Sequence, residues 1–273
     1  MISSSAAADC LTIAAPHAVL DMHGKSLIGP GSGATGAGIH VLSSATGAYI
    51  DGIGAVITKF GTGILIEGSD VAIFSVELIR NEQFGLVING GARNALYDSD
   101  AGSLSDFSSG NGVAGVMINN GSNNFINDIH ADHNGKYGIE VSGGSSNHLH
   151  DLDGDFNGIY GLWINGSSGN RIVNSTGSHD QQIGIYIGCA PTGGLGGVCP
   201  APATGSNNVI DFGEATSNTM NGIAVDSSDL ANQIGLNSIV DNGATDAVDA
   251  NANCGTNLWF LNQIGTAAPN CIH

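Results

Sequence analysis

The stretch Gly138-Ile139-Glu140-Val141 is one copy of a phrase, a glycine followed by alternating residues, that recurs at nearly constant spacing. It returns 23 residues later as Gly161-Leu162-Trp163-Ile164, and after another 23 as Gly184-Ile185-Tyr186-Ile187. The other copies lie at 22 to 38 residues from their neighbours and begin at Gly38, Gly63, Gly85, Gly115 and Gly222. A repeat of this length is typical of a solenoid, in which each coil buries its apolar side against the next.

Each coil holds three short strands. Apolar and variable residues alternate within the phrase, which is the pattern of a strand with one buried face. A second apolar position follows about eleven residues later, at Ile126, Leu149 and Ile172, and a third at Ile129 and Leu152. No stretch has the length and periodicity of a helix, so the sequence predicts an all-β chain.

Turn residues stand at matching places between the strands. Asn or Asp precedes the glycine phrase at Asn81, Asn134, Asn157, Asp180, Asn218 and Asn242. Because coils stack about 4.8 Å apart, we expect these side chains to form hydrogen-bonded ladders. The prediction is a single-domain parallel β-helix of about ten coils of ~23 residues, right-handed because parallel crossovers almost always are. It divides into a first coil with its cap (1–35), repeats (36–250) and a C-terminal cap (251–273).

The repeats, together with an opening segment that runs from Val19 to Gly31, resemble the right-handed parallel β-helix proteins of the pectate-lyase-like superfamily. The resemblance implies the fold and leaves the activity open, because this superfamily holds lyases, hydrolases, epimerases, phage tailspikes, adhesins and periplasmic accessory proteins. The Asp-Pro-His-Asp signature of alginate epimerases is absent, and its nearest match is Ser178-His179-Asp180. The polygalacturonase motifs are also missing.

The charge balance limits the choice of partners. With 24 acidic and 6 basic residues the chain carries a net charge of −18, which disfavours nucleic acid and anionic membrane surfaces. The sequence contains no apolar run of the length that spans a bilayer, so no membrane insertion is expected. A polysaccharide is the expected partner, and a neutral or weakly charged one suits this surface better than a polyuronate. The choice between monomer and homo-oligomer stays open.

The cysteines favour export. Cys189 and Cys199 bracket a Gly/Pro-rich loop, Cys254 and Cys271 bracket the C-terminal segment, and Cys10 is left over. Two such local pairs read as disulfides of a secreted or periplasmic protein whose signal peptide has been removed. Free thiols in the cytosol, or a metal site, are the alternatives.

One outward stripe combines rings with polar groups. Two places after the glycine stand Met117, Glu140, Trp163 and Tyr186, and Asn119 and Asn165 follow two further along. Flat rings beside amides and a carboxylate suit the faces and rims of sugars, so these residues are the expected substrate-binding platform. The alternative is that the insert between Cys189 and Cys199 folds back and buries the rings.

A second outward stripe is acidic. It contains His130 and Asp132 on one coil and Asp153 and Asp155 on the next, and these four are the candidate catalytic residues. Carboxylates about 5 to 7 Å apart fall in the range that glycosidases use for acid–base work. Calcium is the possible cofactor, held by Asp98, Asp100, Asp132, Asp153 and Asp155, and no organic cofactor is expected. The simpler alternative is a solvated acidic face.

These features favour a secreted, glycan-active β-helix that acts on an extracellular polysaccharide as a hydrolase, lyase or epimerase. The alternative from another class is a non-catalytic surface or adhesion module that binds glycan or protein. A periplasmic accessory protein that handles metal is a third possibility, and it depends on the acidic stripe alone.

Overall fold

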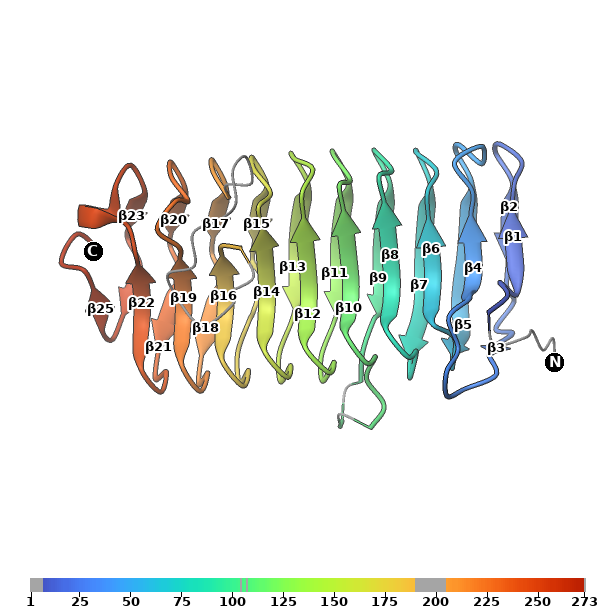
Figure 1. Ribbon diagram of the computed structural model, residues 1–273, viewed down its shortest axis with the longest axis horizontal. Helices are drawn as coiled ribbons and strands as arrows, with labels where there is room; N and C mark the ends of the chain where they lie inside the picture. Colours follow the sequence, from blue (N-terminus) through green and yellow to red (C-terminus); the bar gives the residue numbers. More distant parts are fainter. Residues whose placement is uncertain (1–6, 104, 107, 190–204, 273) are drawn as a thin grey trace.

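The computed structural model describes residues 7–103, 105–106, 108–189 and 205–272. It is a rod of stacked coils with the chain ends at its two ends (Figure 1). Every strand pairing is parallel, and the coils wind as a right-handed β-helix, as the repeat spacing predicts. Among the described residues, no helix is long and apolar enough to cross a membrane.

The first sheet is built from the glycine phrases. Each phrase places its glycine and the residues around it in register with those of the next coil, as Ile139 pairs with Leu162. The eleven strands follow in chain order: β1 (Leu11–Ile13), β4 (Ala37–Val41), β6 (Thr62–Ile66), β8 (Phe84–Asn89), β10 (Ala114–Asn119), β12 (Tyr137–Ser142), β14 (Tyr160–Asn165), β16 (Ile183–Ile187), β19 (Asn221–Val225), β22 (Thr245–Asp249) and β25 (Ala267–Ala268).

The second sheet carries the other two apolar positions of most coils. Its strands are β2 (Val19–Asp21), β5 (Tyr49–Thr58), β7 (Ala72–Ile79), β9 (Ala95–Asp100), β11 (Phe125–His130), β13 (His148–Asp153), β15 (Arg171–Val173), β17 (Val209–Asp211), β20 (Gln233–Gly235) and β23 (Leu258–Phe260), and β3 (Leu27–Ile28) pairs with β5. In the last coils the third side is a separate sheet of β18 (Glu214–Thr216), β21 (Ser238–Val240) and β24 (Gln263–Ile264).

The long strands of the second sheet turn a corner within themselves. Ser75, Asp98, Asp128 and Asp151 occupy the corner in successive coils, each with φ between 47° and 58°. Asp tolerates this left-handed conformation better than most residues, because its short polar side chain can bond locally. The corner separates the residues before it from those after it, which belong to different sides of the coil.

The core is a continuous column of aliphatic side chains. Ile39, Ile64, Leu86, Val116 and Ile139 come from the same position of successive coils, and none is more than 1% exposed. Like residues stack on like because the coil repeats its register. Burying one such side chain is worth about 1.5–3 kcal/mol.

The expected asparagine ladders are present inside the turns. Asn111 Nδ2 donates to Asn134 Oδ1 at 3.1 Å, and the N–H of Asn134 donates to Asn157 Oδ1 at 2.9 Å. A second ladder links the amides of Asn124 and Asn147 at 3.0 Å. These side chains satisfy buried backbone groups that the strands leave unpaired, so the ladders hold the turns in place.

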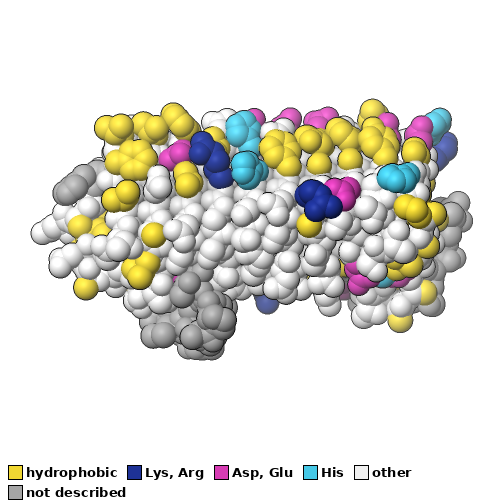
Figure 2. All heavy atoms as spheres, turned by 90° about the horizontal axis from the view of Figure 1, so that it is seen from above, with side chains coloured by type: hydrophobic (Ala, Val, Ile, Leu, Met, Phe, Trp, Pro, Cys, Tyr) yellow, Lys and Arg dark blue, Asp and Glu magenta, His cyan; other side chains and the backbone are white. Residues whose placement is uncertain are grey.

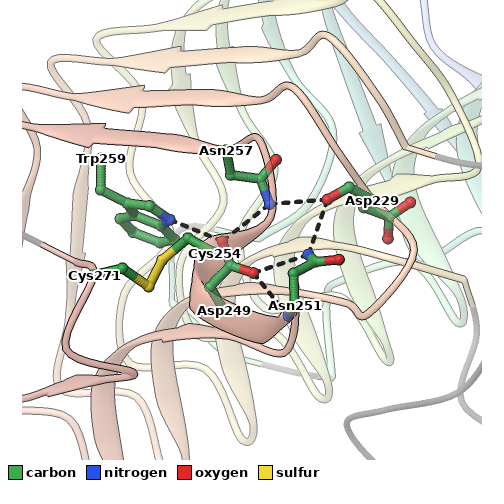
Figure 3. The surroundings of a disulfide bond; sticks show 7 residues. All are labelled: Asp229, Asp249, Asn251, Cys254, Asn257, Trp259 and Cys271. Atoms are coloured by element: carbon green, nitrogen blue, oxygen red, sulfur yellow. Dashed lines mark hydrogen bonds between the residues drawn. A yellow bond between two sulfur atoms is a disulfide. The ribbon is translucent and has the colours of Figure 1, made fainter.

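A disulfide closes the C-terminal end (Figure 3). Cys254, at the end of the 3-10 helix η1 (Ala252–Cys254), is bonded to Cys271, and the two Cα atoms lie 6.0 Å apart. The carboxylate of Asp249 beside it is 3% exposed and accepts hydrogen bonds from Trp259 Nε1, Asn257 Nδ2 and both nitrogens of Asn251. The predicted Cys254–Cys271 pair is confirmed. The other predicted pair includes Cys199, which lies outside the described residues.

Candidate functional site

The acidic stripe forms an ordered ladder at the ends of β9, β11 and β13. In the strand register Asp100, His130, Asp153 and Thr176 are successive partners. His130 Nδ1 lies 3.1 Å from Asp100 Oδ1, and its Nε2 lies 3.4 Å from Asp153 Oδ2. One imidazole therefore bridges two carboxyl groups on a solvent-accessible surface.

Asp132 and Asp155 form a second row, two residues further along the chain. The N–H of Asp155 donates to Asp132 Oδ1 at 2.9 Å, and the N–H of Ser178 donates to Asp155 Oδ1 at 2.8 Å. The hydroxyl of Thr176 joins the rows, because it lies 2.8 Å from Asp155 Oδ1 and 3.1 Å from Asp153 Oδ1. The four residues that the repeat register assigned to the acidic stripe thus lie together.

The proton affinities in this cluster are shifted. Burial, reinforced by the charges of Asp155 and Asp153, raises the pKa of Asp132 to about 7, against the opposing hydrogen bond from the Asp155 N–H. Burial also raises the pKa of Asp155, although Thr176 and Ser178 donate to it. For His130 burial lowers the pKa, but the hydrogen bond and charge of Asp100, with the charges of Asp153 and Asp132, outweigh it and raise the pKa overall.

This arrangement can exchange protons near neutral pH. A carboxyl group with a pKa near 7 is protonated often enough to act as an acid and ionised often enough to act as a base. The neighbouring Asp153 supplies a second carboxyl group on the same surface. Shifts of this kind are enriched at functional sites, although structural networks also produce them.

One neighbour of the cluster, Glu77, was not predicted from the sequence. Glu77 pairs with Asp100 in the register and stands eight residues before Gly85, as His130 stands eight before Gly138. The same rule that found His130 could therefore have found Glu77. Asp98 does not join the ladder: it sits at the corner, where Ser75 Oγ donates to its Oδ2 at 2.8 Å.

The predicted calcium site stays a prediction. Within the part of the chain that the structure describes, no three His, Cys, Asp or Glu side chains converge in a way that could hold a metal ion. The expected ligands Asp100, Asp132, Asp153 and Asp155 instead contact His130, Thr176 and backbone N–H groups.

The aromatic stripe differs from the expected open platform. Trp163 is 3% exposed and Tyr186 is 0% exposed, so neither ring offers a face to a sugar. They pack with Tyr160, Ile183 and Ala224 in a second apolar cluster outside the main core. Trp163 Nε1 donates to the Gly188 carbonyl at 2.8 Å, and Tyr186 Oη donates to Asp226. Expecting these two rings to form an exposed stacking surface was therefore wrong. The alternative, that the insert between Cys189 and Cys199 buries them, concerns residues 190–204, which lie outside the described residues.

The polar members of that stripe bond to one another. Glu140 is buried, which raises the pKa of its carboxyl group, and Asn165 Nδ2 donates to it at 3.1 Å. Asn119 Nδ2 donates to Asn89 Oδ1 at 2.9 Å, and Met117 is half-buried between coils. The side chains of Glu140, Asn119 and Asn165 thus serve the stacking of the coils, and their binding of substrate stays a prediction.

A row of exposed and half-buried rings lies on the second sheet. Tyr49, Phe74, Tyr97 and Phe125 follow one another, with ring centroids 4.7 to 5.6 Å apart. Figure 2 shows hydrophobic side chains gathered in a band along one edge of the rod, on a surface that is otherwise mostly polar and uncharged. The rings of Phe74 and Tyr97 stack on each other, so they stabilise the stack of coils and offer mainly their edges to solvent.

The comparisons with known proteins agree with this architecture. A family profile described as a right handed beta helix region matches residues 37–151 and 62–197, which together span more than half of the chain. A search of curated proteins finds no significant match.

Solved structures with the same fold are distant in sequence. The periplasmic alginate epimerase AlgG has a TM-score of 0.61 and 11% identity, over 98% of this chain and 76% of that one. The A-module of mannuronan C-5 epimerase AlgE4 from Azotobacter vinelandii has a TM-score of 0.53 and 14% identity, over 88% and 63%. Tailspike protein 2 of bacteriophage CBA120 has a TM-score of 0.54 and 13% identity, over 92% and 42%. Such identities show the fold alone, and with the family profile they establish that the chain belongs to the right-handed parallel β-helix family.

Proposed function

We propose that this protein is a polysaccharide-active enzyme that uses the cluster of His130, Asp132, Asp153 and Asp155 for acid–base chemistry. The observation that carries the proposal is the position of Asp132. Its pKa is raised to about 7, and it lies beside a second carboxyl group and an imidazole on an accessible face of the rod. The alginate and mannuronan epimerases that share this fold support a polysaccharide as the substrate class.

Hydrolysis of a glycosidic bond is the reaction that this pair supports best. Asp132 would protonate the leaving oxygen, and Asp153 would serve as the base or nucleophile on the other side of the bond. Thr176 orients the Asp153 carboxyl group through the hydrogen bond at 3.1 Å, and His130 holds its other oxygen. A lyase or an epimerase would use the same residues to remove a proton from a sugar ring.

We also propose that the protein works outside the cytosol. The Cys254–Cys271 disulfide is of the kind that persists in oxidising compartments. The similarity to an epimerase described as periplasmic is consistent with that location.

The second candidate is a non-catalytic binding module, and one observation favours it. Asp132 and Asp155 each accept a backbone N–H of the next coil, so both carboxyl groups stabilise the turns whether or not they react. In that case the acidic face would serve solubility and the rod would bind its glycan without turnover.

Turnover on a polysaccharide panel separates the candidates. New reducing ends without unsaturated sugars indicate hydrolysis, new reducing ends together with unsaturated non-reducing ends indicate elimination, and a changed sugar composition at constant chain length indicates epimerisation. Asp132→Asn keeps an oxygen to accept the Asp155 N–H, and we expect it to lower turnover at least a hundredfold. Asp128→Asn removes the same charge at an exposed position of the same coil and should be without effect. Binding without turnover in the wild-type protein would contradict the enzymatic proposal.

A further inference from the structure

Two basic residues share a hollow at the edge of the rod next to the acidic face. Lys59 and Arg80 occupy equivalent turns of successive coils, where the N–H of Lys59 donates to the Arg80 carbonyl at 3.1 Å. They line a hollow of about 560 Å³ that includes Gly29, Gly31, Gly110 and Gly112, so much of its wall is bare backbone. Both basic side chains are exposed, so a ligand in solution can reach them.

Within the described part of the chain, neither of these two residues is paired with a carboxylate, although the chain is strongly acidic. With 24 acidic residues against 6 basic ones, a cation has carboxylates available almost everywhere. Arg93 uses one, with Nε 2.6 Å from Asp70 Oδ1, and Arg171 lies 3.7 Å from Asp211. Across the described residues, neither Lys59 nor Arg80 makes an ion pair within 4.0 Å.

The hollow keeps its positive charge although it contains one acid. Glu82 is part of its lining and is exposed. Arg80 is instead anchored by its Nη2, which donates to Ser109 Oγ at 2.8 Å, across the next coil. Two cations against one carboxylate leave a local excess of positive charge on a protein with a net charge of −18.

A second hollow lies between this one and the acid–base cluster. It has a volume of about 310 Å³, shares Arg80 with the first hollow, and is also lined by Glu77, Asp100, Ser103 and Ser109. Asp100 in turn contacts His130 at 3.1 Å. Arg80 is two coils from His130, which is about 10 Å along the rod at 4.8 Å per coil.

We propose that Lys59 and Arg80 form a subsite for an anionic group, a carboxylate or a sulfate ester, on the polysaccharide that the acid–base cluster acts on. The inference rests on the proposed function and adds its substrate class. It replaces the neutral glycan that net charge favours, because a ligand responds to the charges within about 10 Å of it more than to the sum over the whole surface. A guanidinium and an ammonium on neighbouring coils can both donate to one anionic group.

The test compares binding of charged and uncharged glycans by the full chain. The probes are polygalacturonate, carboxyl-reduced polygalacturonate and dextran sulfate, and affinity is measured at 50 mM and 500 mM salt by biolayer interferometry on the immobilised protein. The subsite variant is Lys59→Gln with Arg80→Gln. The matched control is Lys25→Gln with Lys136→Gln, which changes the net charge equally at two exposed positions away from the hollow.

We expect the subsite variant to bind at least one charged glycan tenfold or more weakly, and the control to bind it within twofold of wild type. If the subsite variant binds only polygalacturonate more weakly, the group bound at the subsite is a carboxylate. If it binds only dextran sulfate more weakly, that group is a sulfate ester. Equal weakening of both double variants, no weakening, or no binding of any charged probe by wild type would overturn the inference. Turnover measured in parallel distinguishes the two proposals: binding that depends on the subsite without turnover refutes only the enzymatic function.

Discussion

Asp180 is an acid in the middle of a ladder of amides, so replacing it tests what holds the coils together. Its Oδ1 accepts the N–H of Asn157 at 2.6 Å, but its Oδ2 has no partner and the residue is 0% exposed. Two other members of the ladder use the corresponding nitrogen: Asn134 Nδ2 donates to the Ala101 carbonyl at 3.1 Å, and Asn218 Nδ2 donates to the Gly177 carbonyl at 2.9 Å. The Nδ2 of Asn157, next to Asp180, has no hydrogen-bond partner among the described residues. Asp180→Asn restores that missing donor.

The gain in stability follows from the cost of the unpaired oxygen. Leaving a buried polar group unsatisfied costs about 1–3 kcal/mol, so we expect Asp180→Asn to raise the free energy of unfolding by about 2 kcal/mol at pH 8. For a chain of this size that is a rise of about 4–8 °C in the unfolding midpoint. Burial, with the charges of Asp155 and Asp132, holds the pKa of Asp180 well above its usual value.

The raised pKa of Asp180 also predicts how the stability changes with pH. Because the native state binds the proton of Asp180 more tightly than the unfolded chain, wild-type stability falls as pH rises from about 4 towards the native pKa. The advantage of Asp180→Asn should therefore be smallest at pH 4 and largest at pH 8. The assay is thermal unfolding followed by circular dichroism at pH 4, 6 and 8.

Two variants control this experiment. Asp128→Asn removes an exposed carboxylate and should leave the midpoint within about 1 °C of wild type, since surface changes are worth less than about 0.5 kcal/mol. Asn134→Asp puts an acid into the same ladder and should destabilise the fold. An Asp180→Asn protein that is no more stable than wild type at pH 8 would refute the ladder argument.

Three other expectations concern stability. Replacing Cys254 by Ser should lower the free energy of unfolding by about 3 kcal/mol, measured by urea unfolding, and no change would show that the disulfide contributes nothing to the cap. Trp163→Ala should cost about 3–5 kcal/mol because the ring is buried, so an unchanged midpoint would mean that the ring is exposed after all. A calcium site formed by Asp98, Asp100, Asp132, Asp153 and Asp155 predicts a lower midpoint in EDTA than in millimolar CaCl₂ at constant ionic strength, and equal midpoints would show that calcium does not stabilise the fold.

The repeat spacing was sufficient to predict the architecture, because a solenoid imposes the same residue types on the same place in every coil. The register also brought Asp153 to His130 and Asp155 to Asp132, since a fixed period fixes which residues become neighbours on adjacent coils. Asparagines at one turn position became hydrogen-bonded ladders for the same reason.

The burial of Trp163 and Tyr186 could not be predicted in this way. The register says that both rings leave the sheet on its outer side, but it does not say what packs against them there. The rings pack with Tyr160, Ile183 and Ala224 of the same sheet, and how closely such outward side chains cover one another depends on their conformations. The grouping of Lys59 and Arg80 was missed although their separation of 21 residues fits the repeat, because the strongly acidic composition directed attention to the carboxylates.

The proposed function requires Asp132 to carry the proton in a reaction on a polysaccharide. The most direct measurement is the pH dependence of turnover, from pH 4 to 9, for wild type and Asp132→Asn, with folding of both confirmed by their unfolding midpoints. Because a general acid must be protonated and the pKa of Asp132 is about 7, wild-type activity should fall as pH rises past 7. Asp132→Asn should lose at least a hundredfold across the range. A folded Asp132→Asn protein with more than a tenth of wild-type turnover and the same pH profile would contradict the account.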